Sequence, residues 1–230
     1  MCSSDLDRES GPMSLRYAAF DTAWKQRADA AIDTKVCDCC TTSVATTANG
    51  LITAYRDRTD DEIRDIYVSR MEGDTWTPGT AVHADNWKIP ACPINGPAVS
   101  ARGNAAVVAW FTTQGEQGQA FAAFSNDAGR TWGTPIRLDD GTSTGKVDVE
   151  LLDDGSAVAS WVEFVDKHAQ LRARRIESSG MKSAPIVIVD GDMLKLGGVP
   201  RLARHGNELV FAWNDSGGDR RVRTAVAAIP

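Results

Sequence analysis

The sequence predicts an all-β fold, a six-bladed β-propeller of which the 230 residues would form roughly 4.4 blades at about 52 residues each. The main observation is a repeat: a turn glycine followed by an alternating apolar strand recurs at intervals of 53, 52 and 51 residues. Each of these strands contains an aromatic residue near its end, and helical periodicity is nearly absent. The glycines that mark the repeat are Gly50, Gly103, Gly155 and Gly206.

Each repeat is expected to contain four short antiparallel strands. A shorter strand precedes the marker glycine, and Asn-Gly, Gly-Asn or Asp-Gly at the bend makes the pair a hairpin. In the second complete repeat, a third strand follows over 119–125 and a fourth over 134–138. Four antiparallel strands in about 50 residues are typical of one propeller blade.

The segment 15–21 fits the third strand of a preceding blade. We therefore expect the back half of one blade, three complete blades and the front half of another, in a single partial propeller domain over residues 13–230. Residues 1–12 lack the basic and apolar regions of a signal peptide, and we interpret them as a non-native or disordered leader. On this interpretation the chain is an N-terminally truncated fragment whose export signal would lie upstream.

Charge and hydropathy exclude several classes of function. The net charge of −6 and the pI of about 5.1 argue against a nucleic-acid partner, which would require a basic stripe. The mean hydropathy is −0.28, and no run of about 18 apolar residues predicts a membrane span. We expect a monomer that binds a small-molecule or carbohydrate ligand.

Three of the five cysteines fall within the segment TKVCDCC. In the propeller arrangement, Cys37, Cys39 and Cys40 lie in the loop that enters one blade, and Cys92 lies in the equivalent loop of the next. Adjacent blades bring such loops side by side. All four sulfurs are therefore expected to lie close together on the functional face.

Three kinds of cysteine site remain open. Two disulfides would fit an exported protein, either periplasmic or secreted. A thiolate-rich metal site with His83 or Asp38 nearby would favour zinc or copper, and a free or redox-active thiol is the third alternative. Adjacent Cys39 and Cys40 cannot easily bridge each other, so disulfides would run from them to Cys37 or Cys92.

The loops that follow the second and fourth strands of each blade converge on one face of a propeller, and this face carries function. The loop over 83–96 is long enough to indicate a functional role. In it, Trp87 can stack on a sugar ring, and Lys88 and Asn95 are further candidates for ligand binding.

Candidate catalytic residues are expected in the loops that join second to third strands. Arg56 or Arg58 could hold a carboxylate, and Glu163 or Asp60 could act as a general acid or base. The alternative is that these charges are solvated rim residues that pair with one another.

The turn after the third strand of the second complete blade reads SNDAGRTW. Asp127 can accept hydrogen bonds from N–H groups of its own turn, Gly129 permits a positive φ, and Trp132 can pack between blades. With Ser125 and Thr131, these residues match the Asp box S-x-D-x-G-x-T-W. The chain resembles the sialidase (BNR/Asp-box repeat) superfamily over nearly its full length, and segments such as CDCC and CPINGPA resemble an uncharacterised bacterial branch of it.

The resemblance implies a propeller that binds or hydrolyses a glycoside, with a structural Asp box on the opposite face. Sialidases use three arginines on the substrate carboxylate, a tyrosine nucleophile and an aspartate acid/base. The tyrosines here are Tyr17, Tyr55 and Tyr67, and none lies in the last blades, where the nucleophile of the family belongs. Two functions remain open: an exo-acting glycoside hydrolase or carbohydrate-binding protein, and a non-catalytic propeller with a Cys-rich metal-binding or disulfide-stapled site.

Overall fold

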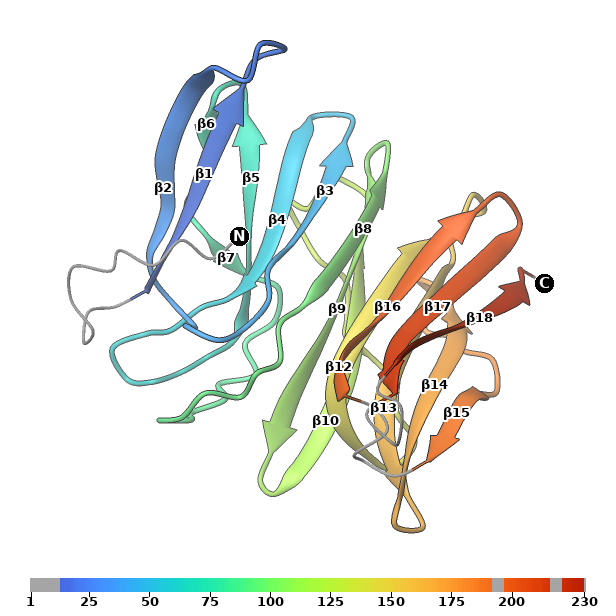
Figure 1. Cartoon of the computed structure of the whole chain (residues 1–230). Helices are drawn as coiled ribbons and strands as arrows, with labels where there is room; N and C mark the ends of the chain where they lie inside the picture. Colours follow the sequence, from blue (N-terminus) through green and yellow to red (C-terminus); the bar gives the residue numbers. More distant parts are fainter. Residues whose placement is uncertain (1–12, 192–196, 216–220, 230) are drawn as a thin grey trace.

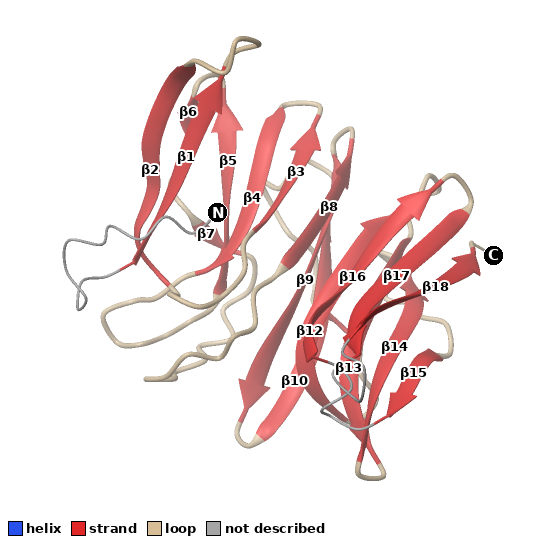
Figure 2. Ribbon diagram, viewed as in Figure 1, coloured by secondary structure: helices blue, strands red, loops and turns tan. Residues whose placement is uncertain are grey.

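The computed structural model describes residues 13–191, 197–215 and 221–229, and every regular element in these ranges is a β-strand (Figure 2). The strands form antiparallel sheets that follow one another along the chain and fan out side by side (Figure 1). The predicted all-β partial propeller is confirmed. Within the described ranges no helix has the length and hydrophobicity needed to cross a membrane. The leader proposed for residues 1–12 lies outside them.

The described strands form a two-stranded sheet, three sheets that correspond to complete blades, and a three-stranded sheet. In the first complete blade the outer strand is divided into two pieces that both pair with the third strand. In chain order the strands are β1 (Met13–Phe20), β2 (Gln26–Val36), β3 (Ser43–Thr47), β4 (Gly50–Arg56), β5 (Ile66–Glu72), β6 (Thr75–Trp76), β7 (Thr80–Ala81), β8 (Ala98–Arg102), β9 (Ala105–Gln114), β10 (Gln117–Ser125), β11 (Ile136–Arg137), β12 (Thr142–Leu151), β13 (Ala157–Val165), β14 (His168–Ile176), β15 (Ile186–Gly191), β16 (Gly197–His205), β17 (Glu208–Asp215) and β18 (Arg221–Ala228).

The first strands of successive blades contact one another, as expected of the strands nearest a propeller axis: β3 contacts β8, β8 contacts β12, and β12 contacts β16. At each contact, a side-chain oxygen of one strand accepts a backbone N–H of the next. The three bonds run from Val99 to Ser43 (3.0 Å), from Leu151 to Ser100 (3.0 Å) and from Leu202 to Asp148 (2.9 Å). The donors are spaced by 52 and 51 residues, so the sequence repeat encodes the contact between blades.

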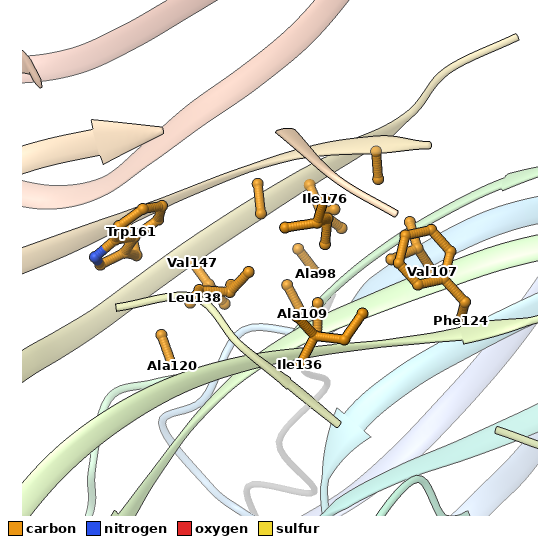
Figure 3. Packing of buried hydrophobic residues seen from close by; sticks show 14 of the residues in the cluster. Ala98, Val107, Ala109, Ala120, Phe124, Ile136, Leu138, Val147, Trp161 and Ile176 are labelled. Atoms are coloured by element: carbon orange, nitrogen blue, oxygen red, sulfur yellow. The ribbon is translucent and has the colours of Figure 1, made fainter. Parts of the chain in front are cut away.

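A cluster of buried hydrophobic side chains lies between the second and third complete blades (Figure 3). The cluster contains Trp161 and Val147 of the third blade and Val107 and Leu138 of the second, and Trp161 and Leu138 are fully buried. Val162, next to Trp161 on β13, belongs instead to the cluster on the other side of the blade. Because side chains alternate along a strand, the third blade is buried on both faces.

The Asp-box segment Ser125–Trp132 joins β10 to β11. Asp127 Oδ1 accepts the Thr131 N–H at 2.9 Å, and Asp127 Oδ2 accepts the Thr131 hydroxyl at 2.6 Å. Ser125 donates to Asp127 at 2.7 Å and accepts the Gly129 N–H at 2.9 Å. Burial raises the pKa of Asp127, but hydrogen bonds from Thr131 and Ser125 outweigh burial and lower the pKa to about 2.

The same segment also contacts neighbouring structure. Trp132 packs against the cluster between the first and second complete blades, and a Cβ at Gly129 would meet the Ile52 side chain. Ala128 N donates to Asn104 O in the β8–β9 turn. That turn lies at the other end of β9 from the β9–β10 hairpin, so the Asp box is on the face opposite the second-to-third-strand loops.

We expect the Asp127→Ala variant to lose about 1–3 kcal/mol of unfolding free energy, because the Thr131 N–H and hydroxyl lose a charged acceptor. Urea denaturation at pH 7 measures this loss. Asn126→Ala, at the exposed neighbouring position, is the control and should change the unfolding free energy by less than about 0.5 kcal/mol. Equal losses in the two variants would contradict the role given to Asp127.

Candidate functional site

The loop after β4, residues 57–65, and the loop after β7, residues 82–97, lie together at the lower left of the molecule in Figure 2. Arg64 N, in the loop after β4, donates to Trp87 O, in the loop after β7, at 2.9 Å, and Ile63 forms a β-bridge with Lys88. Buried Asp65 accepts the Trp87 N–H at 3.0 Å. Backbone pairing therefore holds Trp87 and Lys88 in place.

Arg56 is the centre of this loop network and is only 2% exposed. Each of its three guanidinium nitrogens donates to a backbone carbonyl: Nε to Asn95 (2.7 Å), Nη1 to Arg64 (2.5 Å) and Nη2 to Phe111 (2.6 Å). Trp87 covers the guanidinium at 4.9 Å from its ring centroid. Burial lowers the pKa of Arg56 to about 9. The prediction that Arg56 holds a substrate carboxylate is corrected, because its donors are engaged inside the protein.

Arg58 and Asp60 pair with neighbouring charges. The Arg58 guanidinium donates to Glu62 through Nε at 3.1 Å and Nη2 at 2.8 Å, and Nη1 lies 3.4 Å from Asp38. Asp60 accepts Lys35 Nζ at 2.6 Å and its side chain is almost fully exposed. Both residues lie at the rim of the loop face in ion pairs.

Glu163 lies inside β13 and not in a loop, and it is 2% exposed. Trp161 Nε1 donates to Glu163 Oε2 at 2.8 Å, and Arg172 Nη1 lies 3.5 Å from the same oxygen. The sequence predicts Glu163 in the loop that joins the second to the third strand. The strand instead continues to Val165, and Asp166 and Lys167 make a tight turn with positive φ. The prediction of a loop acid or base at Glu163 is therefore corrected.

The structure brings four cysteines together on the loop face. Disulfides join Cys37 to Cys40 and Cys39 to Cys92, with Cα–Cα distances of 5.6 and 6.2 Å. Cys37 and Cys40 are buried, Cys39 is half-buried and Cys92 is exposed. Cys37 Sγ lies 3.9 Å from Cys39 Sγ, so the two bridges touch. The loops that carry them are adjacent, since a Cβ at Gly96 would collide with the Thr41 carbonyl.

His83 is not part of this sulfur cluster. Its Nδ1 lies 2.7 Å from Asp85 Oδ1, and Trp110 Nε1 donates to Asp85 Oδ2 at 2.8 Å. Within the described ranges, the cluster of three or more close metal-ligating side chains consists of Cys37, Cys39 and Cys40.

A cavity of about 390 Å³ opens on the same face, where segments that enter three successive blades meet. Ile94, Lys146 and Gly198 line it at intervals of 52 residues, and all three have left-handed backbones, with φ of 51°, 54° and 71°. A β-branched residue such as Ile94 rarely adopts this conformation, and such strain is concentrated at functional sites. Asn95, next to Ile94, holds the neighbouring segment in place, because its side chain accepts the Lys146 N–H at 2.9 Å and donates to Thr144 O at 3.3 Å.

Lys146 lines the cavity but is not among the site residues predicted from the sequence. It is the one charged side chain among the described residues that line the cavity, where Ile94 and Val162 supply apolar surface. Burial lowers the pKa of the Lys146 ammonium group. The signal that could have found it is its spacing of 52 residues from Ile94.

Asp57 is a second residue of the loop face that is not among the predicted site residues. Burial raises its pKa to about 6, and the charges of Asp33 and Asp65 act in the same direction while Lys35 opposes them. Asp33 also accepts the hydroxyl of buried Tyr55 at 2.7 Å. Asp57 lies two residues after the marker aromatic of its repeat, as Glu163 does in its own, and this shared position was a signal in the sequence.

No family model and no curated protein match this sequence. Among solved structures, a Hadza microbial sialidase is similar at 21% identity and a TM-score of 0.53, and the match covers 80% of this chain and 43% of that one. Trypanosoma rangeli sialidase is similar at 12% identity and a TM-score of 0.51, and the match covers 90% of this chain and 38% of that one. A GH43_1 enzyme from Xanthomonas citri is similar at 13% identity and a TM-score of 0.53, and the match covers 81% of this chain and 69% of that one. The chain spans less than half the length of the two sialidases. At these identities the likeness shows the propeller fold, shared with glycoside hydrolases.

The raised pKa of Asp57 predicts a pH-dependent stability. The relevant pH window runs from 3.8, the ordinary pKa of an aspartate, to about 6, the pKa of Asp57 in the folded chain. In this window the folded chain binds more protons at Asp57 than the unfolded chain does. The ionisation of Asp57 therefore makes folding less favourable as the pH rises. Asp57→Asn removes the ionisation. We expect its unfolding free energy, relative to wild type, to increase between pH 4 and pH 7.5 by on the order of 1 kcal/mol after solvent screening.

Urea denaturation at the two pH values measures the effect. Asp60→Asn is the control, because the hydrogen bond from Lys35 lowers the pKa of Asp60 and the variant should lose relative stability as pH rises. A relative stability of Asp57→Asn that is independent of pH would contradict the pKa direction given to Asp57.

The Cys39–Cys92 bridge closes a loop with a sequence separation of 53. In the chain-entropy description, Cys39→Ala/Cys92→Ala should lower the unfolding free energy by about 4 kcal/mol under oxidising conditions. With a thiol reductant present, the difference from wild type should nearly disappear, because neither protein then has the bridge. A difference that is the same under both conditions would show that packing, and not the bridge, is responsible.

Proposed function

We propose that this chain belongs to a carbohydrate-acting propeller and binds a small saccharide on its loop face, in the cavity lined by Ile94, Lys146 and Gly198. The observation that carries the proposal is the convergence of three repeat-related, left-handed backbone positions on one cavity. The similar solved structures are named as sialidases, a GH43_1 enzyme, a xylan β-1,4-xylosidase and a β-fructofuranosidase, which supports a sugar as the ligand. The two disulfides support export, since such bonds persist in oxidising compartments.

The lining indicates the chemistry of the ligand. Val162 and the exposed Ile94 offer apolar contact to a sugar ring, and the half-buried Lys146 ammonium group favours an anionic substituent. Asn95 is occupied by the backbone of the neighbouring blade, so it positions Lys146. An acidic monosaccharide or a short acidic glycan fits these features.

Binding is better supported than hydrolysis at this cavity. Glycoside hydrolysis ordinarily uses two carboxyl groups on either side of the scissile bond, and none of the described residues that line the cavity carries a carboxyl group. Glu163, inside β13, and Asp57, directly after β4, are buried away from solvent. Hydrolysis is the second candidate, favoured by the names of the similar structures, and it would require acids supplied from elsewhere on the loop face.

We expect Lys146→Met to weaken binding of an acidic monosaccharide such as sialic acid or glucuronic acid by roughly 10- to 100-fold, the size of a charge-assisted hydrogen bond. Isothermal titration calorimetry or ligand-observed NMR with the oxidised chain measures this. Lys88→Met, on the same face but outside the cavity lining, is the matched control and should bind nearly as wild type does.

Equal weakening in the two lysine variants, or equal binding of neutral and acidic sugars, would contradict the assignment of the cavity. Turnover of fluorogenic glycosides by the same preparations separates binding from hydrolysis. Turnover that survives Lys146→Met would place the chemistry elsewhere on the loop face.

A further inference from the structure

The cysteine cluster has a geometry beyond what two disulfides require. The Sγ atoms of Cys37, Cys39 and Cys40 all lie within 4.8 Å of one another, and Cys92 meets Cys39 from the adjacent loop. Cys37 and Cys39 sulfurs are 3.9 Å apart. Sulfurs on the edges of a tetrahedral zinc tetrathiolate, with Zn–S bonds of about 2.3 Å, are separated by about 3.8 Å.

The charge next to the cluster favours anionic sulfur. Arg64 Nη1 lies 3.5 Å from Cys37 Sγ, and Arg64 is 4% exposed. Its Nη2 pairs with Glu62 at 2.9 Å, but its Nε is buried with no hydrogen-bond partner among the described residues. A neutral disulfide is a weak hydrogen-bond acceptor for a buried guanidinium, whereas a thiolate would pair with its positive charge. This feature is independent of the spacing of the sulfurs.

Burial is graded across the cluster. Cys37 and Cys40 lie in the protein interior, and Cys92 is exposed. A reductant and then an ion can therefore reach the cluster from the Cys92 side, while the interior side excludes water. Three close cysteines, with Cys92 bonded to Cys39 on the exposed side, can supply the four ligands of a closed structural metal site.

We propose that the four cysteines form a redox-controlled zinc site, with two disulfides when oxidised and a zinc tetrathiolate when reduced. Each disulfide takes up two electrons and two protons from a thiol or phosphine reductant to give two thiols. One Zn²⁺ then displaces four protons from the four thiols, and the site becomes a dianion beside the Arg64 cation. Both states join the loops that enter the first and second complete blades, so the metal replaces one cross-link by another.

The test uses the full chain with Cys2→Ser, so that the four cluster thiols are counted alone. After anaerobic reduction, we expect four thiols per folded chain, uptake of one Co²⁺ with the visible absorption bands of a tetrahedral tetrathiolate, and displacement of Co²⁺ by Zn²⁺. Zinc should also raise the urea midpoint of the reduced chain toward that of the oxidised chain.

Cys92→Ser is the informative variant, because the exposed position tolerates serine without disturbing the core. It should weaken Co²⁺ binding at least about 100-fold and change the absorption bands, since three sulfurs remain. His83→Ala is the matched control and should bind Co²⁺ as the parent does. The proposal is overturned if reduced folded protein takes up no stoichiometric metal, if Cys92→Ser binds as tightly as the parent, or if reduction unfolds the chain. Saccharide binding by the oxidised chain is measured in a separate experiment, and its result does not depend on the outcome of the metal test.

Discussion

The buried guanidinium of Arg56 ties together the parts of the chain on which the loop face depends. Its three nitrogens donate hydrogen bonds to the backbone carbonyls of Asn95, Arg64 and Phe111. Asn95 lies in the loop that enters the second complete blade, Arg64 in the loop after β4, and Phe111 in β9. A buried cation is costly unless it is fully hydrogen-bonded. The network can therefore form only when these segments are in place together, and this requirement couples the long loops to the blades.

The cavity and the cysteine cluster are consequences of the same arrangement. The backbone N–H of Cys37 donates to the carbonyl of Arg56, and the Arg56 Nε holds the carbonyl of Asn95. Between them, Cys92 is followed directly by the segment that lines the cavity. A bridge or a metal at the cysteines therefore acts next to the wall of the proposed saccharide site, although the two sites can be tested independently.

The sequence predicted the blades and the close approach of the cysteines because both follow from spacing. It placed Arg56 and Glu163 wrongly because exposure was inferred from their position near strand ends. β13 extends past Glu163 into a tight turn, and Arg56 finds an acceptor as far along the chain as Phe111. Lys146 and Asp57 were overlooked for the opposite reason, since each lay among ordinary loop charges until its burial was known.

The sequence by itself determined the repeat, the strand order and the Asp-box turn, because alternation, turn glycines and hydrogen bonds within eight residues are local properties. It also determined which cysteines could meet. Only the tertiary structure decided which charges are buried, which carbonyls Arg56 serves, and that Ile94, Lys146 and Gly198 share one cavity. The physical reason is that burial and the choice of hydrogen-bond partners depend on segments about 50 residues apart, which come together only when the blades pack.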